Sequence, residues 1–134
     1  MIVLKTVFME GKFRNFELDK FKEILNSCNH NCVISTGGGL GANEDAIKLI
    51  KDKYKDDTIV VWINIPFNVV KNKLSTLKNR PLIKRLSINE LKELYNMRKQ
   101  KYSELADIVI SNNWRRKPHH IVSEIINKVK QIKK

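Results

Sequence analysis

Cysteine, proline and glycine are scarce in this chain, which limits the kinds of site and boundary it can contain. The 134 residues include two cysteines, three prolines and five glycines. No repeat, low-complexity linker or Pro/Gly-rich stretch divides them, so we expect a single domain over residues 1–134. Cys28 and Cys32 have no second pair, which fits neither a structural zinc site nor a C-x-x-C redox motif. We therefore expect two reduced, partly buried thiols and no metal site.

Long apolar runs are also missing. The longest, from Ile59 to Ile65, is far shorter than the roughly 20 residues that a membrane span requires, and it is interrupted by Asn64. The apolar start of the chain is broken by Lys5 and is too short for a secretory signal. These absences predict a soluble, cytoplasmic protein without a membrane partner.

Acidic residues are few relative to basic ones. The chain has 26 Lys and Arg against 14 Asp and Glu, which gives a net charge of +12. A positive field favours anionic partners such as nucleotides, carboxylate metabolites or nucleic acid. The lysines are scattered through every segment, which indicates a bias of the whole composition. A basic nucleic-acid-binding module is therefore an alternative and not the leading hypothesis.

Three of the five glycines stand together at the end of an apolar run. The run is Cys32–Thr36, and Gly37–Gly39 follow it. An apolar run bounded by glycine predicts a buried strand, and glycines let backbone N–H groups approach a ligand closely. Open α/β sheets bind their ligands at such strand ends, so we expect a small anion here. The glycines are not a Walker A phosphate loop, because no G-x-x-x-x-G-K-[ST] occurs in the sequence.

Helical and strand patterns alternate along the chain. Apolar spacing and capping residues predict helices at 13–28, from Asn43, from Pro66, from Ser87 with Glu90 as a capping box, and from Pro118. β-branched runs predict strands at 32–36, 58–64 and 108–110, and residues 1–8 also fit a strand by propensity. This alternation predicts an α/β domain with a parallel sheet and right-handed crossovers.

Several motifs, taken in order, resemble the shikimate kinase family. They are Phe13-Arg14 with Glu17, Gly37–Gly39, Asn43, Val60-Val61-Trp62, Arg80-Pro81-Leu82, and Arg98 before Tyr102, Glu104 and Ala106-Asp107. The resemblance extends from Phe13 onward. It implies a P-loop kinase-like fold of the nucleoside monophosphate kinase type, with a five-stranded parallel sheet. It also implies a transferase of aromatic amino acid biosynthesis, which uses ATP and Mg²⁺ to phosphorylate the 3-hydroxyl of shikimate.

The resemblance also implies which residues bind shikimate. Arg14 and Arg98 match the arginines that hold the carboxylate, a group that guanidinium can grip bidentately. Glu17 lies one helical turn beyond Arg14, close enough to orient its guanidinium and to accept a ligand hydroxyl. Gly37, Gly38 and Gly39 would offer backbone N–H groups to the same ligand.

The nucleotide side of the resemblance rests on fewer residues. Arg80 matches a catalytic arginine on a lid at about residues 78–89, where it would contact ATP and neutralise charge on the transferring phosphoryl group. Arg115 or Arg116 would stack against adenine, and the sequence does not choose between them.

Some parts that the resemblance implies are missing from these residues. Relatives begin with a central strand, a phosphate loop with its Lys and Mg²⁺-binding Ser or Thr, and an aspartate near the reacting hydroxyl. None of these matches a segment of this chain. We therefore expect an incomplete sheet that lacks its central first strand, with unsatisfied edges at 32–36 and 58–64, and no activity from the chain alone. A non-catalytic remnant and a split subunit completed by a separate N-terminal polypeptide both remain open.

Overall fold

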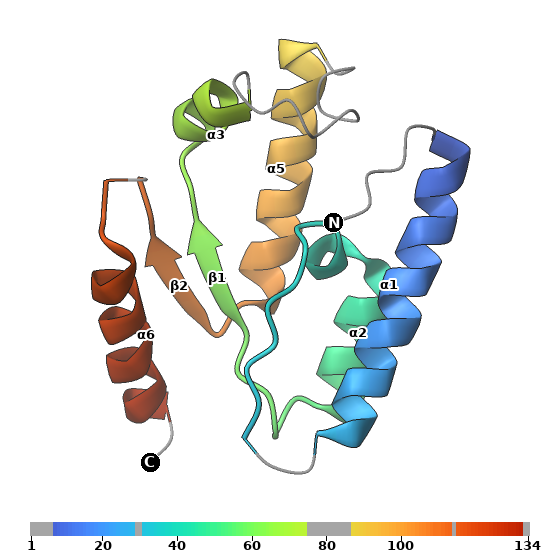
Figure 1. The fold of residues 1–134 in the computed structure, drawn as a ribbon, viewed down its shortest axis with the longest axis vertical. Helices are drawn as coiled ribbons and strands as arrows, with labels where there is room; N and C mark the ends of the chain where they lie inside the picture. Colours follow the sequence, from blue (N-terminus) through green and yellow to red (C-terminus); the bar gives the residue numbers. More distant parts are fainter. Residues whose placement is uncertain (1–6, 29–30, 75–86, 114, 133–134) are drawn as a thin grey trace.

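A computed structural model describes residues 7–28, 31–74, 87–113 and 115–132. Its elements, in chain order, are α1 (Val7–Ser27), the 3₁₀ turn η1 (Leu40–Ala42), α2 (Glu44–Lys53), β1 (Val61–Asn64), α3 (Phe67–Leu74), α5 (Ile88–Leu105), β2 (Ile108–Ser111) and α6 (Pro118–Ile132). In Figure 1, α6 lies beside β2, while α1 and α2 lie at the opposite side of the molecule.

The sheet of the described residues consists of β1 and β2, which are parallel. Val61 lies opposite Ile108 and Asn64 lies opposite Ser111. Asp107, just before β2, fixes the start of the pair because its Oδ2 accepts a hydrogen bond of 2.7 Å from the backbone N–H of Val60. The parallel pairing of strands separated by helices confirms the predicted α/β class with a parallel sheet.

Two helix starts follow the capping residues predicted from the sequence. The Asn43 side chain accepts hydrogen bonds from the backbone N–H of Asp45 at 2.9 Å and of Ala46 at 3.2 Å. Ser87 Oγ accepts from Glu90 N at 3.1 Å, and Glu90 Oε1 accepts from Ser87 N at 3.4 Å, which completes a capping box. Both predictions are confirmed, because capping depends on residues only two or three positions apart.

The apolar core is divided into two clusters. The first joins α1, η1 and α2 through buried Leu18, Phe21, Leu40 and Ala46. The second joins β2 and α6 through buried Ile108, Ile110 and Ile121. Ile34 packs against the first cluster and Val61 against the second. The segment that leads to the three glycines therefore belongs to the α1 and α2 side of the molecule.

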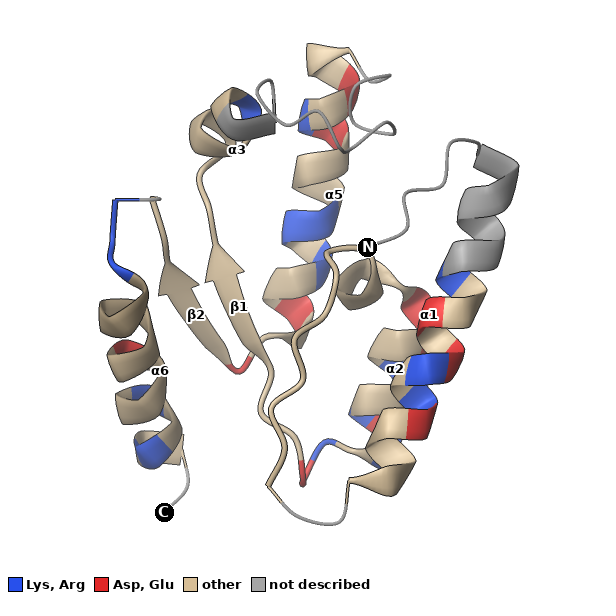
Figure 2. Ribbon diagram, viewed as in Figure 1, with Lys and Arg blue, Asp and Glu red and all other residues tan. Residues whose placement is uncertain are grey.

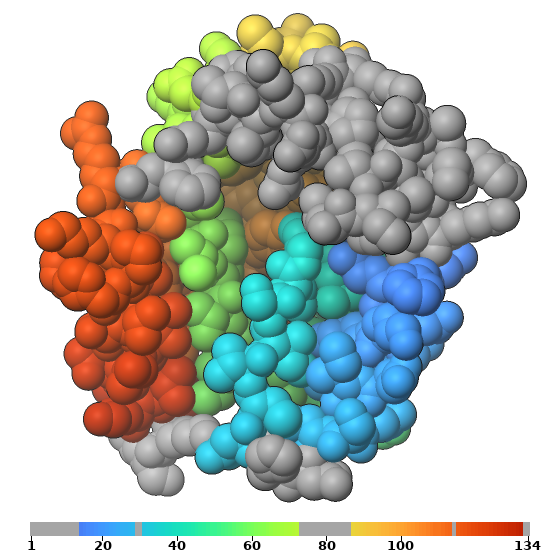
Figure 3. All heavy atoms as spheres, in the orientation of Figure 1, coloured from blue at the N-terminus to red at the C-terminus, as the bar shows by residue number. Residues whose placement is uncertain are grey.

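The predicted strand at Cys32–Thr36 is wrong, since residues 31–37 belong to no helix or strand. The Val33 side chain is 101% exposed, and Figure 3 shows this segment, in cyan, at the surface between α1 and the green segment that contains β1. A strand is made by hydrogen bonds to a neighbour, and within the described chain β1 pairs with β2 alone. The apolar pattern is present, but no strand in the described ranges pairs with the segment.

Two smaller predictions are also wrong. Val7 and Phe8 lie in α1 rather than in a strand, and the rest of the strand predicted at 1–8 lies outside the described residues. Helix extension adds one hydrogen bond per residue, which outweighs a weak strand propensity. Cys28 and Cys32 form a disulfide, with Cα atoms 6.5 Å apart, instead of two thiols. The chain reverses direction after α1, and this reversal brings the two sulfurs together.

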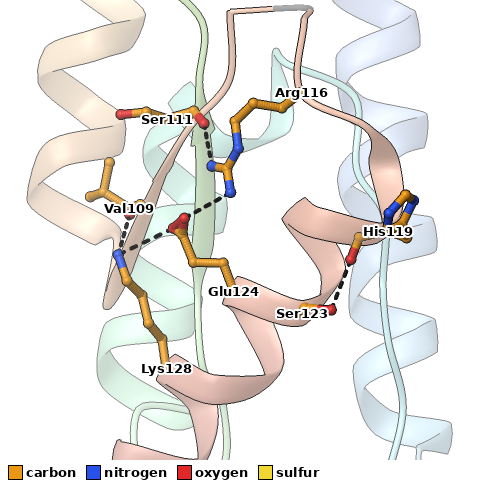
Figure 4. Close-up of polar contacts among 7 residues, drawn as sticks. All are labelled: Val109, Ser111, Arg116, His119, Ser123, Glu124 and Lys128. Carbon is orange, nitrogen blue, oxygen red and sulfur yellow. Dashed lines mark hydrogen bonds and ion pairs between the residues drawn. The ribbon is translucent and has the colours of Figure 1, made fainter.

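The outer edge of β2 is covered by charged side chains from beyond the strand. Ile108 N donates to Val60 O, and Asn112 N donates to Asn64 O. The backbone N–H and C=O groups of the alternate residues Val109 and Ser111 therefore point away from β1. Lys128 Nζ donates to Val109 O at 3.1 Å, and Arg116 Nη1 donates to Ser111 O at 2.8 Å (Figure 4). These contacts block the kind of strand addition to which an open sheet edge is prone.

Glu124 joins the two cations on this edge (Figure 4). It lies 3.0 Å from Arg116 Nη2 and 3.5 Å from Lys128 Nζ. Desolvation opposes its charge, but hydrogen bonds and attraction from Arg116 and Lys128 outweigh that effect and lower the pKa of Glu124 from its usual value of 4.5. The carboxylate therefore stabilises the folded chain in its charged form.

This lowered pKa predicts a pH dependence of stability. A carboxylate with a lowered pKa stabilises the fold above its usual pKa and loses that contribution as the pH falls through the folded value. We expect the free energy of unfolding to fall more in the wild type than in Glu124→Gln between about pH 6 and pH 3, measured by urea denaturation. Glu23→Gln removes an exposed pair with Lys20 and serves as the control. Identical pH profiles for the wild type and Glu124→Gln would contradict this role.

No helix in the described part of the chain is both long enough and apolar enough to cross a membrane.

Candidate substrate site

The three consecutive glycines lie between side chains of α1 and α5, and each one faces a charged or polar side chain. A methyl group at Gly37 would lie 3.0 Å from Glu17 Oε2, and one at Gly38 would lie 3.2 Å from Arg98 Nη1. A methyl group at Gly39 would overlap the guanidinium of Arg14. Because the glycines have no side chains, they leave room for these polar groups against the backbone.

Arg14 and Glu17 form the α1 side of the site. Arg14 Nη1 donates to Glu17 Oε1 at 3.0 Å, and the two side chains are 28% and 16% exposed. The pair lies one helical turn apart on the buried side of α1, where Leu18 and Phe21 anchor the helix. The contact that would let Glu17 orient Arg14 is present, while their part in ligand binding remains a prediction.

Arg98 and Tyr102 form the α5 side. They are four residues apart, so they share one face of the helix. The hydroxyl of Tyr102 donates to the carbonyl oxygen of Gly38. Burial raises the pKa of Tyr102, and the charges of Arg98 and Arg14 act in the opposite direction. Both guanidiniums therefore lie close enough to act on the same phenol, next to the glycines.

The structure brings the sequence-predicted shikimate residues together. Three separate segments contribute to the group. The side chains of Arg14 and Glu17 from α1 and of Arg98 from α5 lie beside the backbone of Gly37–Gly39. Two guanidiniums beside backbone of this kind have the chemistry to bind an anion that accepts several hydrogen bonds, such as a carboxylate.

A cavity of about 180 Å³ lies between β1, α3 and α5 and adjoins this site. Arg98 and Tyr102 line it, together with Trp62, Asn64 and Tyr95. Asn64 Oδ1 is buried and has no hydrogen-bond partner within the described ranges. The guanidinium and the phenol on its wall suit this cavity to a ligand with polar groups, such as hydroxyls.

Only two of the three arginines predicted to contact the nucleotide lie in the described residues. Arg80, with most of the predicted lid, lies outside the described residues. Arg116 is held by Ser111 and Glu124 at the edge of β2. Arg115 is exposed, and its backbone N–H donates to Asn113 Oδ1 at 2.9 Å. The two adjacent arginines therefore have different surroundings.

Acidic, histidine and cysteine side chains do not form a metal-binding group in the described residues. No group of three or more His, Cys, Asp or Glu side chains in this part of the chain could hold a metal ion. The sequence contains no phosphate-loop motif either.

Sequence reasoning did not identify Tyr102 or Asn64 as site residues. Tyr102 was only a marker of the family resemblance, although its position four residues after Arg98 places both on one face of a helix. Asn64 interrupts an apolar strand at its carboxyl end, where ligands of parallel sheets bind. Helical spacing and strand position were the signals that could have identified them.

Comparison with known proteins decides the family. The sequence model of the shikimate kinase family matches residues 4–130. The chain belongs to the shikimate kinase family. It is 39% identical over 117 residues to the shikimate kinase of Aquifex aeolicus, covering 87% of this chain and 64% of that relative. It is 38% identical over 122 residues to the shikimate kinase of a Sulfurihydrogenibium species, covering 91% and 68%.

A solved structure extends this family assignment to the fold. The crystal structure of shikimate kinase from Aquifex aeolicus matches with a TM-score of 0.69 and 37% identity, over 90% of this chain and 66% of that one. The match confirms the predicted P-loop kinase-like fold. This shikimate kinase family chain spans about two thirds of the length of the relatives it matches first.

Proposed function

We propose that this chain carries the shikimate-binding part of a cytoplasmic shikimate kinase, which transfers the γ-phosphate of ATP to the 3-hydroxyl of shikimate. The observation that supports it most strongly is the convergence of Arg14 and Arg98 on the three glycines. Family membership makes shikimate the expected ligand, and shikimate carries one carboxylate and several ring hydroxyls. These groups match two guanidiniums and the acceptor oxygens of Glu17.

In the proposed site, each side chain acts on a different part of shikimate. The arginines bind the carboxylate through charge-assisted hydrogen bonds, which are stronger than neutral ones. Glu17 holds Arg14 and offers its other oxygen, beside Gly37, to a ring hydroxyl. The backbone at Gly37–Gly39 approaches the ligand closely because no side chain intervenes.

In the same proposal, Arg80 neutralises charge on the phosphoryl group of ATP that is transferred. Arg115 or Arg116, which follow β2, contacts the adenine ring. Arg116 is already engaged by Glu124 and Ser111. Arg115 has an exposed side chain and is therefore the better candidate for stacking on adenine.

Phosphoryl transfer in this proposal requires a strand and phosphate loop that are not among these 134 residues. They would lie in additional residues of the same polypeptide or in a separate one. Within the described residues, segment 33–36 pairs with no strand and β1 pairs with β2 alone. Both facts support this, because a strand between them would have backbone partners on both sides. A protein that keeps shikimate binding but never receives this strand would be a non-catalytic remnant.

Nucleic acid binding is not part of the proposal. Figure 2 shows Lys and Arg on α1, α2, α5 and α6, with Asp and Glu between them on the same helices. Such mixing does not create the basic stripe that tracks a phosphate backbone.

Calorimetric titration with shikimate and with its methyl ester tests the proposed ligand. The ester keeps the ring hydroxyls and loses the negative charge. Hydrogen bonds to a charged group predict about tenfold to hundredfold tighter binding of the acid than of the ester. Equal affinities, or no binding of the acid at millimolar concentration, would contradict the proposal.

Gly39→Ala is expected to weaken shikimate binding about tenfold with little change in stability. The backbone at Gly39, with φ −72° and ψ −28°, accepts alanine without strain. The added methyl group displaces the guanidinium of Arg14, which is the far end of a flexible side chain. Calorimetry and urea denaturation measure the two effects.

The Arg14→Ala background provides the control for Gly39→Ala. If the methyl group acts through Arg14, Gly39→Ala causes no further loss of affinity once Arg14 is absent. An additional loss in that background would show that Gly39 acts on the ligand by another route.

A further inference from the structure

Tyr102 contacts the glycine segment, residues 37–41, at two places and Trp62 at a third. Its hydroxyl donates to Gly38 O. Its ring lies so close to Gly41 that an added Cβ there would be 2.8 Å from Tyr102 Cε1. On its other side the ring packs against Trp62 of β1, with centroids 5.9 Å apart. Tyr102 thus connects α5, β1 and the backbone on both sides of Gly39.

Few other contacts fix the peptide at Gly38. Glycine has no side chain to anchor it, and glycine backbone is freer than that of any other residue. The two backbone hydrogen bonds that reach the glycines from the flanking turn, Leu40 N to Gly37 O and Ala42 N to Gly39 O, are both long at 3.3 Å, while Asn43 N to Leu40 O is 3.0 Å. A hydroxyl bound to Gly38 O therefore restrains the most mobile kind of backbone at the point where the site needs fixed N–H groups.

A second tyrosine on α5 makes the same kind of contact at the end of the sheet. Tyr95, two turns before Tyr102, donates from its hydroxyl to Ile65 O at 2.6 Å and packs its ring against Phe67. Arg98 lies between the two tyrosines in the sequence and on the same helix face. Only Tyr102 of the two is bound to the glycine segment.

We propose that Tyr102 is a positioning residue: its hydroxyl holds the Gly38 peptide in place, so that the glycine N–H groups and the Arg98 guanidinium are directed at one ligand carboxylate. That the ligand group is a carboxylate rests on the proposed function. That the Tyr102 hydroxyl restrains the glycine segment does not depend on it. Burial raises the pKa of Tyr102, which keeps the hydroxyl protonated as a donor.

Tyr102→Phe tests this role, and Tyr95→Phe is the matched control. Each variant keeps the ring and removes one hydroxyl that donates to a backbone carbonyl. In the free protein, we expect Tyr102→Phe to speed amide hydrogen exchange at Leu40 and Ala42 about tenfold, while Tyr95→Phe leaves these amides unchanged. We also expect Tyr102→Phe to weaken shikimate binding about tenfold while lowering the urea midpoint no more than Tyr95→Phe does.

Either of two results would overturn the positioning role. One is unchanged exchange at Leu40 and Ala42 in Tyr102→Phe. The other is equal acceleration in both variants, which would show a general contribution to stability. If wild-type protein does not bind shikimate, the proposed function fails, and the exchange comparison still decides the role of Tyr102.

Discussion

The 134 residues alone are expected to give no ATP-dependent phosphorylation of shikimate in a coupled assay for ADP. Phosphoryl transfer depends on positioning and on neutralising charge, and a phosphate loop normally supplies a Lys, a backbone cradle and a Mg²⁺ ligand for both. This sequence has no such motif. The loss of all three groups together should cost several orders of magnitude in rate.

Activity should appear when the missing groups are supplied. We expect a strand, phosphate loop and helix from a relative such as the Aquifex aeolicus enzyme, fused to the chain or added in trans, to produce turnover. Turnover by the 134 residues alone at about 1 to 100 per second, the usual range of kinases, would contradict the requirement for the loop. A completed protein that binds shikimate and ATP but stays inactive would identify the chain as a remnant.

Arg98→Ala is expected to lower shikimate affinity about tenfold to hundredfold. The guanidinium lies against Gly38, in the middle of the glycine segment, and it can bind a carboxylate through two parallel hydrogen bonds. Arg98→Lys should fall between the wild type and the alanine variant, because lysine keeps the charge but not the forked geometry. Calorimetric titration with shikimate measures all three affinities.

Lys99→Ala is the matched control for Arg98. Lys99 is the next residue of α5, lines the same cavity and carries the same charge, but it makes no close approach to the glycines. We expect its removal to change affinity only slightly. Unchanged affinity in Arg98→Ala would contradict its assigned role, and an equal loss in Lys99→Ala would indicate a general effect of positive charge.

Features that depend on nearby residues could be predicted from the sequence. The starts of α2 and α5 follow from Asn43 and from Ser87 with Glu90, since each cap needs residues within one turn. The candidate site could also be predicted from the sequence, but through the order of its motifs and not through local contacts. Its arginines and glycines stand in a recognisable order along the chain, and a shared order implies a shared fold.

Features that depend on distant partners could not be predicted. The segment 32–36 has the composition of a strand, but pairing requires a neighbouring strand that composition does not reveal. The disulfide between Cys28 and Cys32 depends on the path of the chain after α1, and the spacing of the cysteines does not show that path. The contact of Tyr102 with Gly38 joins residues far apart in sequence, so it became visible only in three dimensions.

An NMR titration of the isotope-labelled chain with shikimate tests the proposed site most directly. We expect the largest changes at the backbone amides of Gly37, Gly38 and Gly39 and at the side-chain Nε signals of Arg14 and Arg98. Residues of α6 and the outer edge of β2 should keep their signals. Changes confined to other parts of the chain, or none at millimolar shikimate, would contradict a shikimate site at the three glycines.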